Sequence, residues 1–67
     1  MTFRINADPY RASHAKQPRG FGMWAFEFRC QNRREMRFTP TAMTFSEAKA
    51  WAKRNAPADT WEVRVCP

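Results

Sequence analysis

The 67-residue sequence is poor in the features that mark membranes, secretion and metal sites. It has no apolar run close to the roughly 20 residues of a membrane-spanning helix. Its first ten residues lack the apolar segment of a secretory signal peptide. Two cysteines and a single histidine are too few for any known four-ligand zinc spacing. We therefore expect a cytoplasmic protein with free thiols that needs no membrane, metal or cofactor.

Sequence signals of catalysis are also scarce. There is no P-loop, dinucleotide-binding fingerprint or HExxH motif, and the six acidic residues are not clustered like the paired carboxylates of glycosidases. An RNase that uses His14 together with arginines is the enzymatic alternative. His14, however, lies in a segment that we expect to be an arm or loop, whereas a nucleophile needs a base and an orienting group. We therefore expect a non-enzymatic protein.

Aromatic and basic residues are abundant instead. Six Phe, three Trp and one Tyr can build the core of a single small domain, because each buried aromatic side chain removes roughly 150–250 Å² from water. The formal net charge is +6, and nine of the twelve basic residues are arginine. The planar guanidinium group suits phosphate and carboxylate contacts. The composition therefore favours a polyanion or an acidic protein surface as partner.

Two neighbouring segments alternate between side chains of different character, as strands do. The first covers residues 22–30, and residues 31–35 suit a hairpin turn. In the second, residues 35–43, Met36 and Phe38 lie on one face, opposite Arg37, Thr39 and Thr41; Pro40 makes this an edge strand. The core-facing residues of the first strand are expected to be Trp24, Phe26, Phe28 and Cys30.

A helix and a third strand follow. Thr44 and Glu47 form the T-x-x-E capping box that marks a helix start, and residues 55–57 close the helix. Its apolar arc consists of Phe45, Ala48, Trp51 and Ala52. Residues 60–66 alternate again, with Trp61, Val63 and Val65 expected to face inward.

The order of elements predicts an α+β fold of the type β-β-α-β. A helical crossover places the third strand antiparallel to the first, which gives a three-stranded antiparallel sheet of order 2-1-3 with the helix on one face. Residues 21–67 form this single domain, and residues 1–20 a basic N-terminal arm or loop. Alternation of Phe3 and Ile5 with Arg4 allows a short extra strand in that arm. Phe38 is expected in the core, and the two cysteines at opposite ends of the sheet.

Residues 19–26 read RGFGMWAF and resemble the signature strand of the RNA-recognition motif. In that family the stacking aromatic residues occupy the third and fifth positions of the signature. Phe21 stands at the third position, but Met23 stands at the fifth, and the second signature strand expected upstream is absent. The alternative interpretation is a glycine-punctuated entry into a core strand, with Trp24 and Phe26 buried. We favour the core strand.

Arginines gather at the predicted hairpin and in the arm. Such a cluster can grip a phosphate backbone, and it can equally keep an edge strand from pairing with another chain. The candidate binding residues are Arg11, Arg19, Phe21, Arg29, Arg33, Arg34 and Arg37.

The stretch RFTPTAMTFSEAKAWAKRNAP, followed by WEVRV, resembles the layout of small phage and mobile-element proteins, among them certain anti-CRISPR proteins. Thr44, Glu47, Ala48 and Lys49 carry the resemblance, which covers less than half of the chain. It implies a stoichiometric, phage-encoded inhibitor that blocks a nucleic-acid channel in a host complex without catalysis.

These observations lead to one functional hypothesis and one alternative. The hypothesis is a small basic non-enzymatic binding protein that acts on a nucleic-acid-associated target, such as a host nucleoprotein complex or its acidic protein surface. The alternative is a direct RNA- or DNA-binding module that uses the arginine-rich hairpin and the arm. The sequence leaves the identity of the partner open.

Overall fold

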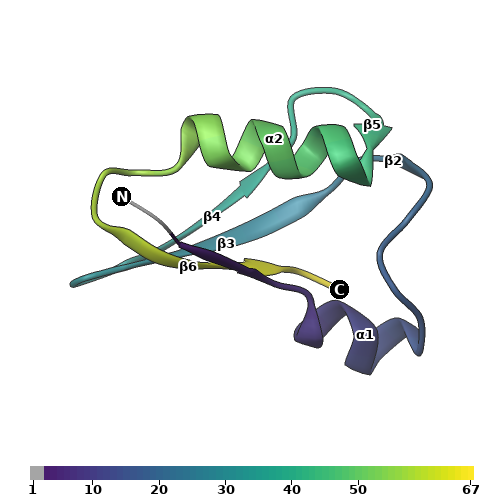
Figure 1. Ribbon diagram of the computed structural model, residues 1–67, viewed down its shortest axis with the longest axis horizontal. Coiled ribbons are helices and arrows are strands. Elements are labelled where there is room, and N and C mark those ends of the chain that lie inside the picture. Colours follow the sequence, from purple (N-terminus) through teal and green to yellow (C-terminus); the bar gives the residue numbers. More distant parts are fainter. Residues whose placement is uncertain (1–2) are drawn as a thin grey trace.

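The computed structural model describes residues 3–67, which form an α+β structure (Figure 1). In chain order its elements are β1 (Arg4–Asn6), α1 (Asp8–His14), β2 (Phe21–Gly22), β3 (Ala25–Cys30), β4 (Arg34–Phe38), β5 (Met43–Thr44), α2 (Phe45–Asn55) and β6 (Thr60–Val65). Four strands form the main sheet in the order β1-β6-β3-β4, and β2 pairs with β5 in a separate two-stranded ladder. No helix among residues 3–67 has the length and apolar character to cross a membrane.

The central part of the sheet follows the predicted order. Strand β3 lies between β4 and β6 and is antiparallel to both, as expected for order 2-1-3. The prediction of a three-stranded antiparallel sheet is nevertheless wrong, because β1 joins the edge of β6 in parallel and makes the sheet mixed and four-stranded. Ile5 of β1 stands opposite Val63, so this extra strand extends the apolar face of the sheet.

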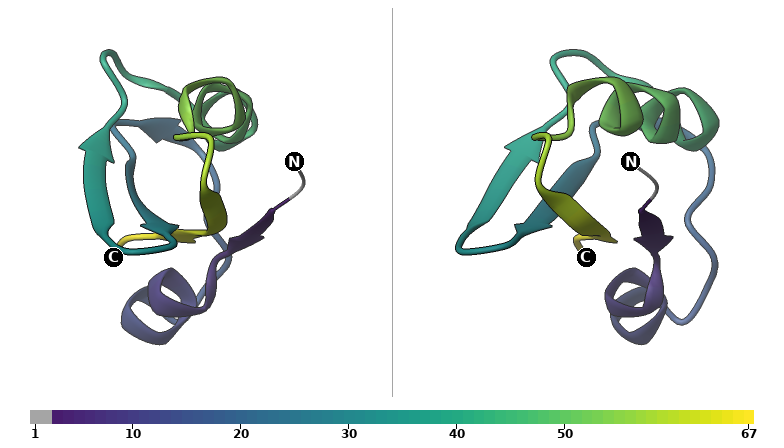
Figure 2. Two further views of the ribbon diagram at one scale, coloured as in Figure 1. Left: turned by 90° about the vertical axis from the view of Figure 1, so that its left-hand side faces the viewer. Right: turned by 60° about the vertical axis from the view of Figure 1, so that its left-hand side comes forward.

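The short extra strand that the sequence allowed in the N-terminal arm is present as β1, whereas the expectation of an arm or loop is wrong for residues 8–14, which form α1. Helix α1 lies at the end of the sheet where β1 and β6 finish, away from α2 (Figures 1 and 2). Tyr10 of α1 packs against the core, with its ring 5.8 Å from that of Trp24. This contact joins residues 14 positions apart in the sequence and positions α1 against the core. No short-range sequence pattern predicts the contact.

The core lies between α2 and one face of the sheet. Two alanines of α2, Ala48 and Ala52, are fully buried, and such small side chains allow the helix to approach the strands closely. Trp51 adds its ring to this layer, 6.3 Å from Phe26 and 6.5 Å from Phe28. The predicted core face of β3 is confirmed. Phe26, Phe28 and Cys30 of the strand are buried, and so is Trp24, which directly precedes it.

Strand β4 presents the opposite face from the one predicted. The Cys30 amide donates to the carbonyl oxygen of Arg33 at 2.9 Å, so the connection is residues 31–32, three residues shorter than the predicted 31–35. This pairs Phe26 with Arg37 and Ala25 with Phe38. Directly opposed residues share a face, and a shift of one residue in register exchanges the two faces. Arg37 therefore lies on the helix side, whereas Phe38 and Met36 are exposed. The prediction that Phe38 belongs to the core is wrong.

Trp61 is also on the face opposite to the one predicted. The pairing of β3 with β6 changes register between Arg29, which opposes Glu62, and Cys30, which opposes Thr60. Trp61 is the extra residue of this bulge, and a bulge redirects side chains that simple alternation would turn inward. Thr60 is buried instead, while the Trp61 side chain is half-exposed and its Nε1 donates to the carbonyl oxygen of Cys30 at 3.1 Å.

The predicted start of α2 is confirmed. The Thr44 hydroxyl oxygen accepts from the Glu47 amide at 3.2 Å, and a Glu47 carboxylate oxygen accepts from the Thr44 amide at 2.9 Å. The two cysteines are free and lie at opposite ends of the sheet, as predicted. Cys30 opposes Thr60, whereas the Cys66 amide donates to the carbonyl oxygen of Ala25.

Candidate functional site

The RGFGMWAF stretch does not form one continuous strand. Gly20 has a φ of +95°, which glycine adopts readily, and it leads into β2, where Phe21 pairs with Thr44 of β5. The main sheet begins again at Ala25. Between the two strands, Trp24 is buried in the core. The interpretation of Trp24 as a core residue is confirmed, and Phe21 lies outside the main sheet.

Exposed apolar side chains surround a hollow at this end of the sheet. Phe21, Met23 and Phe38 are 73%, 57% and 64% exposed, and all three line one depression of about 400 Å³. We call these three residues the sheet-end patch. Other walls of the depression are formed by Tyr10, His14 and Arg19. Large apolar side chains gathered in this way on a small protein indicate a contact surface.

Helix α1 supplies the aromatic wall of this depression. The rings of Tyr10 and His14 are stacked, with 4.1 Å between their centroids. Arg11, on the same helix, does not line the depression; it forms an ion pair with Asp8 and donates to the Gln17 side chain at 3.2 Å. Of the predicted binding residues, the depression therefore brings together only Arg19 and Phe21.

Two of the predicted hairpin arginines stabilise the fold rather than point freely into solvent. Arg33 forms ion pairs with Glu35 at 3.1 Å and with Asp59 at 3.0 Å. Arg37 pairs with Glu35 at 2.8 Å and donates to the carbonyl oxygen of Asn55, the last residue of α2, at 3.2 Å. These contacts connect β4 to the end of α2 and to the segment before β6. Arg33 and Arg37 therefore have structural partners within the chain.

The other two hairpin arginines lie on the open face of the sheet, which α2 does not cover. Arg29 pairs with Glu27 at 3.4 Å and lies 5.9 Å from the ring centre of Trp61. Arg34 approaches Glu27 only at 3.9 Å, and its side chain is 67% exposed. Four residues of strand, about 13 Å, separate Arg34 from Phe38. The hairpin and the sheet-end patch are thus separate surfaces, and Arg34 is the most available of the four hairpin arginines.

Arg33, Glu35, Arg37 and Asp59 form the hairpin network of ion pairs, and their charges shift one another's pKa values. Hydrogen bonds donated by Arg37 and Arg33 hold the pKa of the Glu35 carboxyl below its usual value. In turn, the hydrogen bond to Glu35 and the charge of Asp59 raise the pKa of Arg33. Both directions favour the charged forms, so the network persists as ion pairs at neutral pH.

Acidification is expected to remove the contribution of Glu35 to stability. Because its pKa is lowered in the folded state, this contribution is complete above the pKa of the unfolded chain and is lost as the pH falls through the pKa of the folded state. Melting temperatures of the protein and of Glu35→Gln, measured between neutral and strongly acidic pH, should differ at neutral pH and converge in acid. A difference that stays constant with pH would contradict the role of the Glu35 charge.

The net charge resides in residues outside this network. Five of the six acidic residues form ion pairs with arginine, and the sixth, Glu47, belongs to the capping box. Among residues 3–67, the basic residues that form no ion pair are Arg4, Lys16, Arg19, Lys49, Lys53 and Arg54. Sequence reasoning placed the binding charge at the hairpin and in the N-terminal arm. Of the unpaired basic residues, three lie in residues 4–19 and three on α2, and none lies at the hairpin.

Sequence reasoning also missed Met23, Phe38 and the aromatic wall from α1. Met23 precedes Trp24, which was correctly placed in the core, whereas Phe38 was itself expected in the core. Only the register of β4 shows that Met23 and Phe38 meet at one hollow. In the part of the chain that the structure describes, no three His, Cys, Asp or Glu residues lie close enough together to hold a metal ion. Comparison with protein-family models, curated proteins and solved structures finds no match.

Proposed function

We propose that the chain is a small basic binding protein without catalytic activity that docks on a nucleic-acid-associated target through the sheet-end patch. The observation that carries this proposal is the exposure of Phe21, Met23 and Phe38 around one depression. Aromatic residues, methionine and arginine are the types enriched at protein–protein interfaces. Arg19 lies beside the patch and forms no ion pair within residues 3–67, so the surface combines apolar anchors with a positive charge.

The charge distribution supports an acidic or nucleic-acid-bearing target. Arg34 on the open face and Arg19 beside the patch can both approach anionic groups, because acidic residues of the chain do not neutralise them strongly. A nucleoprotein complex of a host, the target that the resemblance to anti-CRISPR proteins implies, offers such a surface.

A double variant tests the docking surface. Phe21→Ser with Phe38→Ser should reduce binding to the target roughly tenfold or more, because buried aromatic anchors dominate interface energies. The measurement is quantitative affinity enrichment of partner proteins on immobilised chain from nuclease-treated bacterial extract. Trp61→Ser, an exposed aromatic residue remote from the patch, is the matched control and should retain binding. The proposal is contradicted if the unsubstituted protein, the double variant and Trp61→Ser all capture the same partner proteins in equal amounts.

Direct binding of RNA or DNA is the second candidate function, because exposed Phe21 follows the unpaired Arg19 closely. Fluorescence anisotropy with labelled single-stranded RNA and duplex DNA, at low and near-physiological salt, separates the two functions. Docking on protein predicts weak nucleic-acid binding that disappears with salt. Tight binding that survives the higher salt, and that Phe21→Ala weakens by about 1–3 kcal/mol, establishes the alternative instead.

A further inference from the structure

A groove runs along α2 on the side that faces β1. Three adjoining hollows, with volumes of about 470, 330 and 260 Å³, share their lining residues. The first and second have Phe45 and Lys49 in common, and the second and third have Phe3 and Lys53 in common. The hollows therefore form one continuous feature, the α2–β1 groove. It begins near Arg19 and the start of α2.

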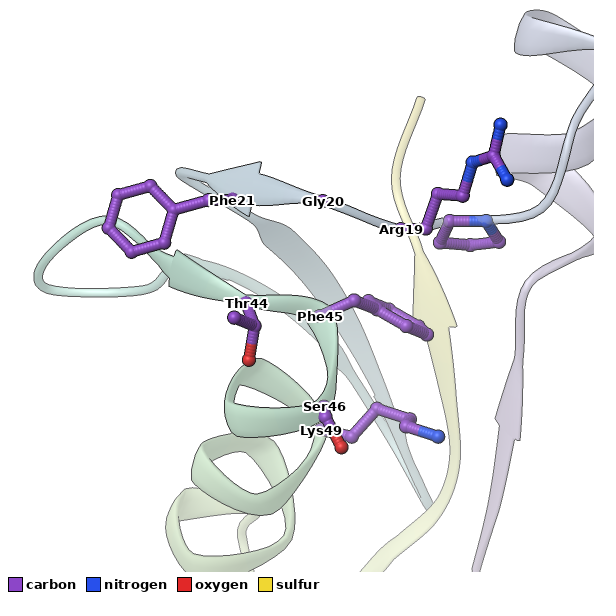
Figure 3. Close-up of a pocket in the computed structure, with 8 residues that line it drawn as sticks. Arg19, Gly20, Phe21, Thr44, Phe45, Ser46 and Lys49 are labelled. Atoms are coloured by element: carbon purple, nitrogen blue, oxygen red, sulfur yellow. The ribbon is translucent and has the colours of Figure 1, made fainter.

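The groove adjoins the sheet-end patch at one end, where Arg19 and Phe21 line both hollows. The Phe21 ring points from β2 away from Phe45 and Lys49, which project in the same direction from α2 (Figure 3). Strand β1 is the edge of the main sheet, and α2 lies over the other strands rather than over β1 (Figure 2). The apolar side chains Phe3 and Ile5 consequently remain only partly buried beside the helix.

All charged residues that line the groove are positive. Arg19, Lys49 and Lys53 line it, and no Asp or Glu does so among the residues that the structure describes. None of the three forms an ion pair within residues 3–67. Lys49 Nζ lies 5.3 Å from the ring centre of Phe45. The groove thus combines an apolar floor with positive charges that the chain leaves uncompensated.

The spacing of these features fits a helical occupant. Helix α2 has 11 residues, so the groove beside it extends about 16 Å, or three helical turns. Lys49 and Lys53 are four residues apart and lie one above the other on the same side of α2. A second helix that lies beside α2 can place carboxylates opposite the two lysines at the same spacing. Apolar side chains on the same helix can then contact Phe3, Ile5 and Phe45.

We propose that the α2–β1 groove binds an acidic amphipathic helix of a partner protein. Its apolar face covers the floor of the groove, and its carboxylates pair with Lys49, Lys53 and Arg19. This surface is additional to the sheet-end patch, and the two adjoin at Arg19 and Phe21, which line both hollows. Single-stranded nucleic acid, which also carries negative charge, is the competing occupant that the experiment distinguishes.

The probe is a fluorescein-labelled synthetic peptide of about 15 residues, with leucines at helical i, i+3, i+4 and i+7 spacing and glutamates flanking them. Anisotropy of this peptide is titrated with the full chain at near-physiological salt. We expect saturable binding that Lys49→Glu with Lys53→Glu weakens roughly tenfold or more, a change of about 1.4 kcal/mol per decade. A scrambled peptide of the same composition should bind at least tenfold more weakly, because it lacks the apolar face.

Arg54→Glu is the matched control, because Arg54 of α2 forms no ion pair with any residue that the structure describes and lines a different hollow. It should leave peptide affinity unchanged, as should Phe38→Ser, which alters the sheet-end patch at a residue that does not line the groove. The neutral pair Lys49→Gln, Lys53→Gln replaces the charge reversal if the latter does not fold by circular dichroism. Three outcomes would overturn the proposal. The peptide does not bind the unsubstituted protein, the groove variants and Arg54→Glu weaken binding equally, or unlabelled single-stranded DNA displaces the labelled peptide.

Discussion

A Phe28→Ala variant should be largely unfolded at room temperature. Phe28 is fully buried at the centre of β3, between Trp51 of α2 and the guanidinium of Arg37, whose central carbon lies 5.7 Å from the ring centre. Replacement of a buried Phe by Ala costs about 3–5 kcal/mol. A single core in a chain of this size rarely supplies more than about 3–5 kcal/mol of stability, so the loss approaches the whole free energy of unfolding.

Urea unfolding followed by tryptophan fluorescence measures this loss. The matched control is Phe38→Ala, which removes the same side chain from an exposed position on β4 and should change stability by no more than about 0.5 kcal/mol. The pair of variants therefore also tests the register of the β3–β4 hairpin. Comparable destabilisation by both variants would show that Phe38 is a core residue and that the described register is wrong.

Thr39→Val should cost about 1–3 kcal/mol, although the two side chains have similar volumes. The Thr39 hydroxyl oxygen accepts from the buried Trp24 amide at 3.1 Å, while the Thr39 amide donates to the Trp24 carbonyl oxygen at 2.8 Å. Valine keeps the second bond but leaves the Trp24 amide without a partner away from water. The cost is therefore the desolvation of that amide rather than a change in packing.

The measurement combines urea unfolding with amide hydrogen exchange. Thr39→Val should lower the midpoint of unfolding and reduce protection of the Trp24 amide, whereas Thr41→Val, at an exposed position, should change neither. Unchanged stability in Thr39→Val would mean that water or another group satisfies the Trp24 amide. Because Trp24 also donates its indole Nε1 to the Met43 carbonyl oxygen at 2.8 Å, this region holds the β2–β5 ladder against the main sheet.

The candidate site was only partly accessible to sequence reasoning. Arg19 and Phe21 were identified, and both border the sheet-end depression. The hairpin arginines were identified as well, but the pairing of Arg33 and Arg37 with Glu35 removes much of their availability. Ion pairs between strands depend on which residues stand opposite each other and which segment passes nearby. Asp59 reaches Arg33 from 26 residues away, and no spacing rule indicates such a contact.

Features set by short-range interactions were predictable from the amino-acid sequence alone. Helix α2 begins and ends where the Thr44–Glu47 capping box and Pro57 place its boundaries, because its hydrogen bonds join residues close in sequence. The alternation of β3 was equally clear, since its core face carries large aromatic residues. The order of the three central strands followed from the helical crossover.

The tertiary structure alone decided the remaining features, because each depends on pairing between distant segments. A turn shorter than predicted exchanged the two faces of β4 and exposed Phe38. A bulge opposite Arg29 and Cys30 turned Trp61 outward. The pairing of β1 with β6 completed the sheet and left, beside α2, the lysine-lined groove. Local alternation records which residues share a face, but the register between strands determines which face is buried.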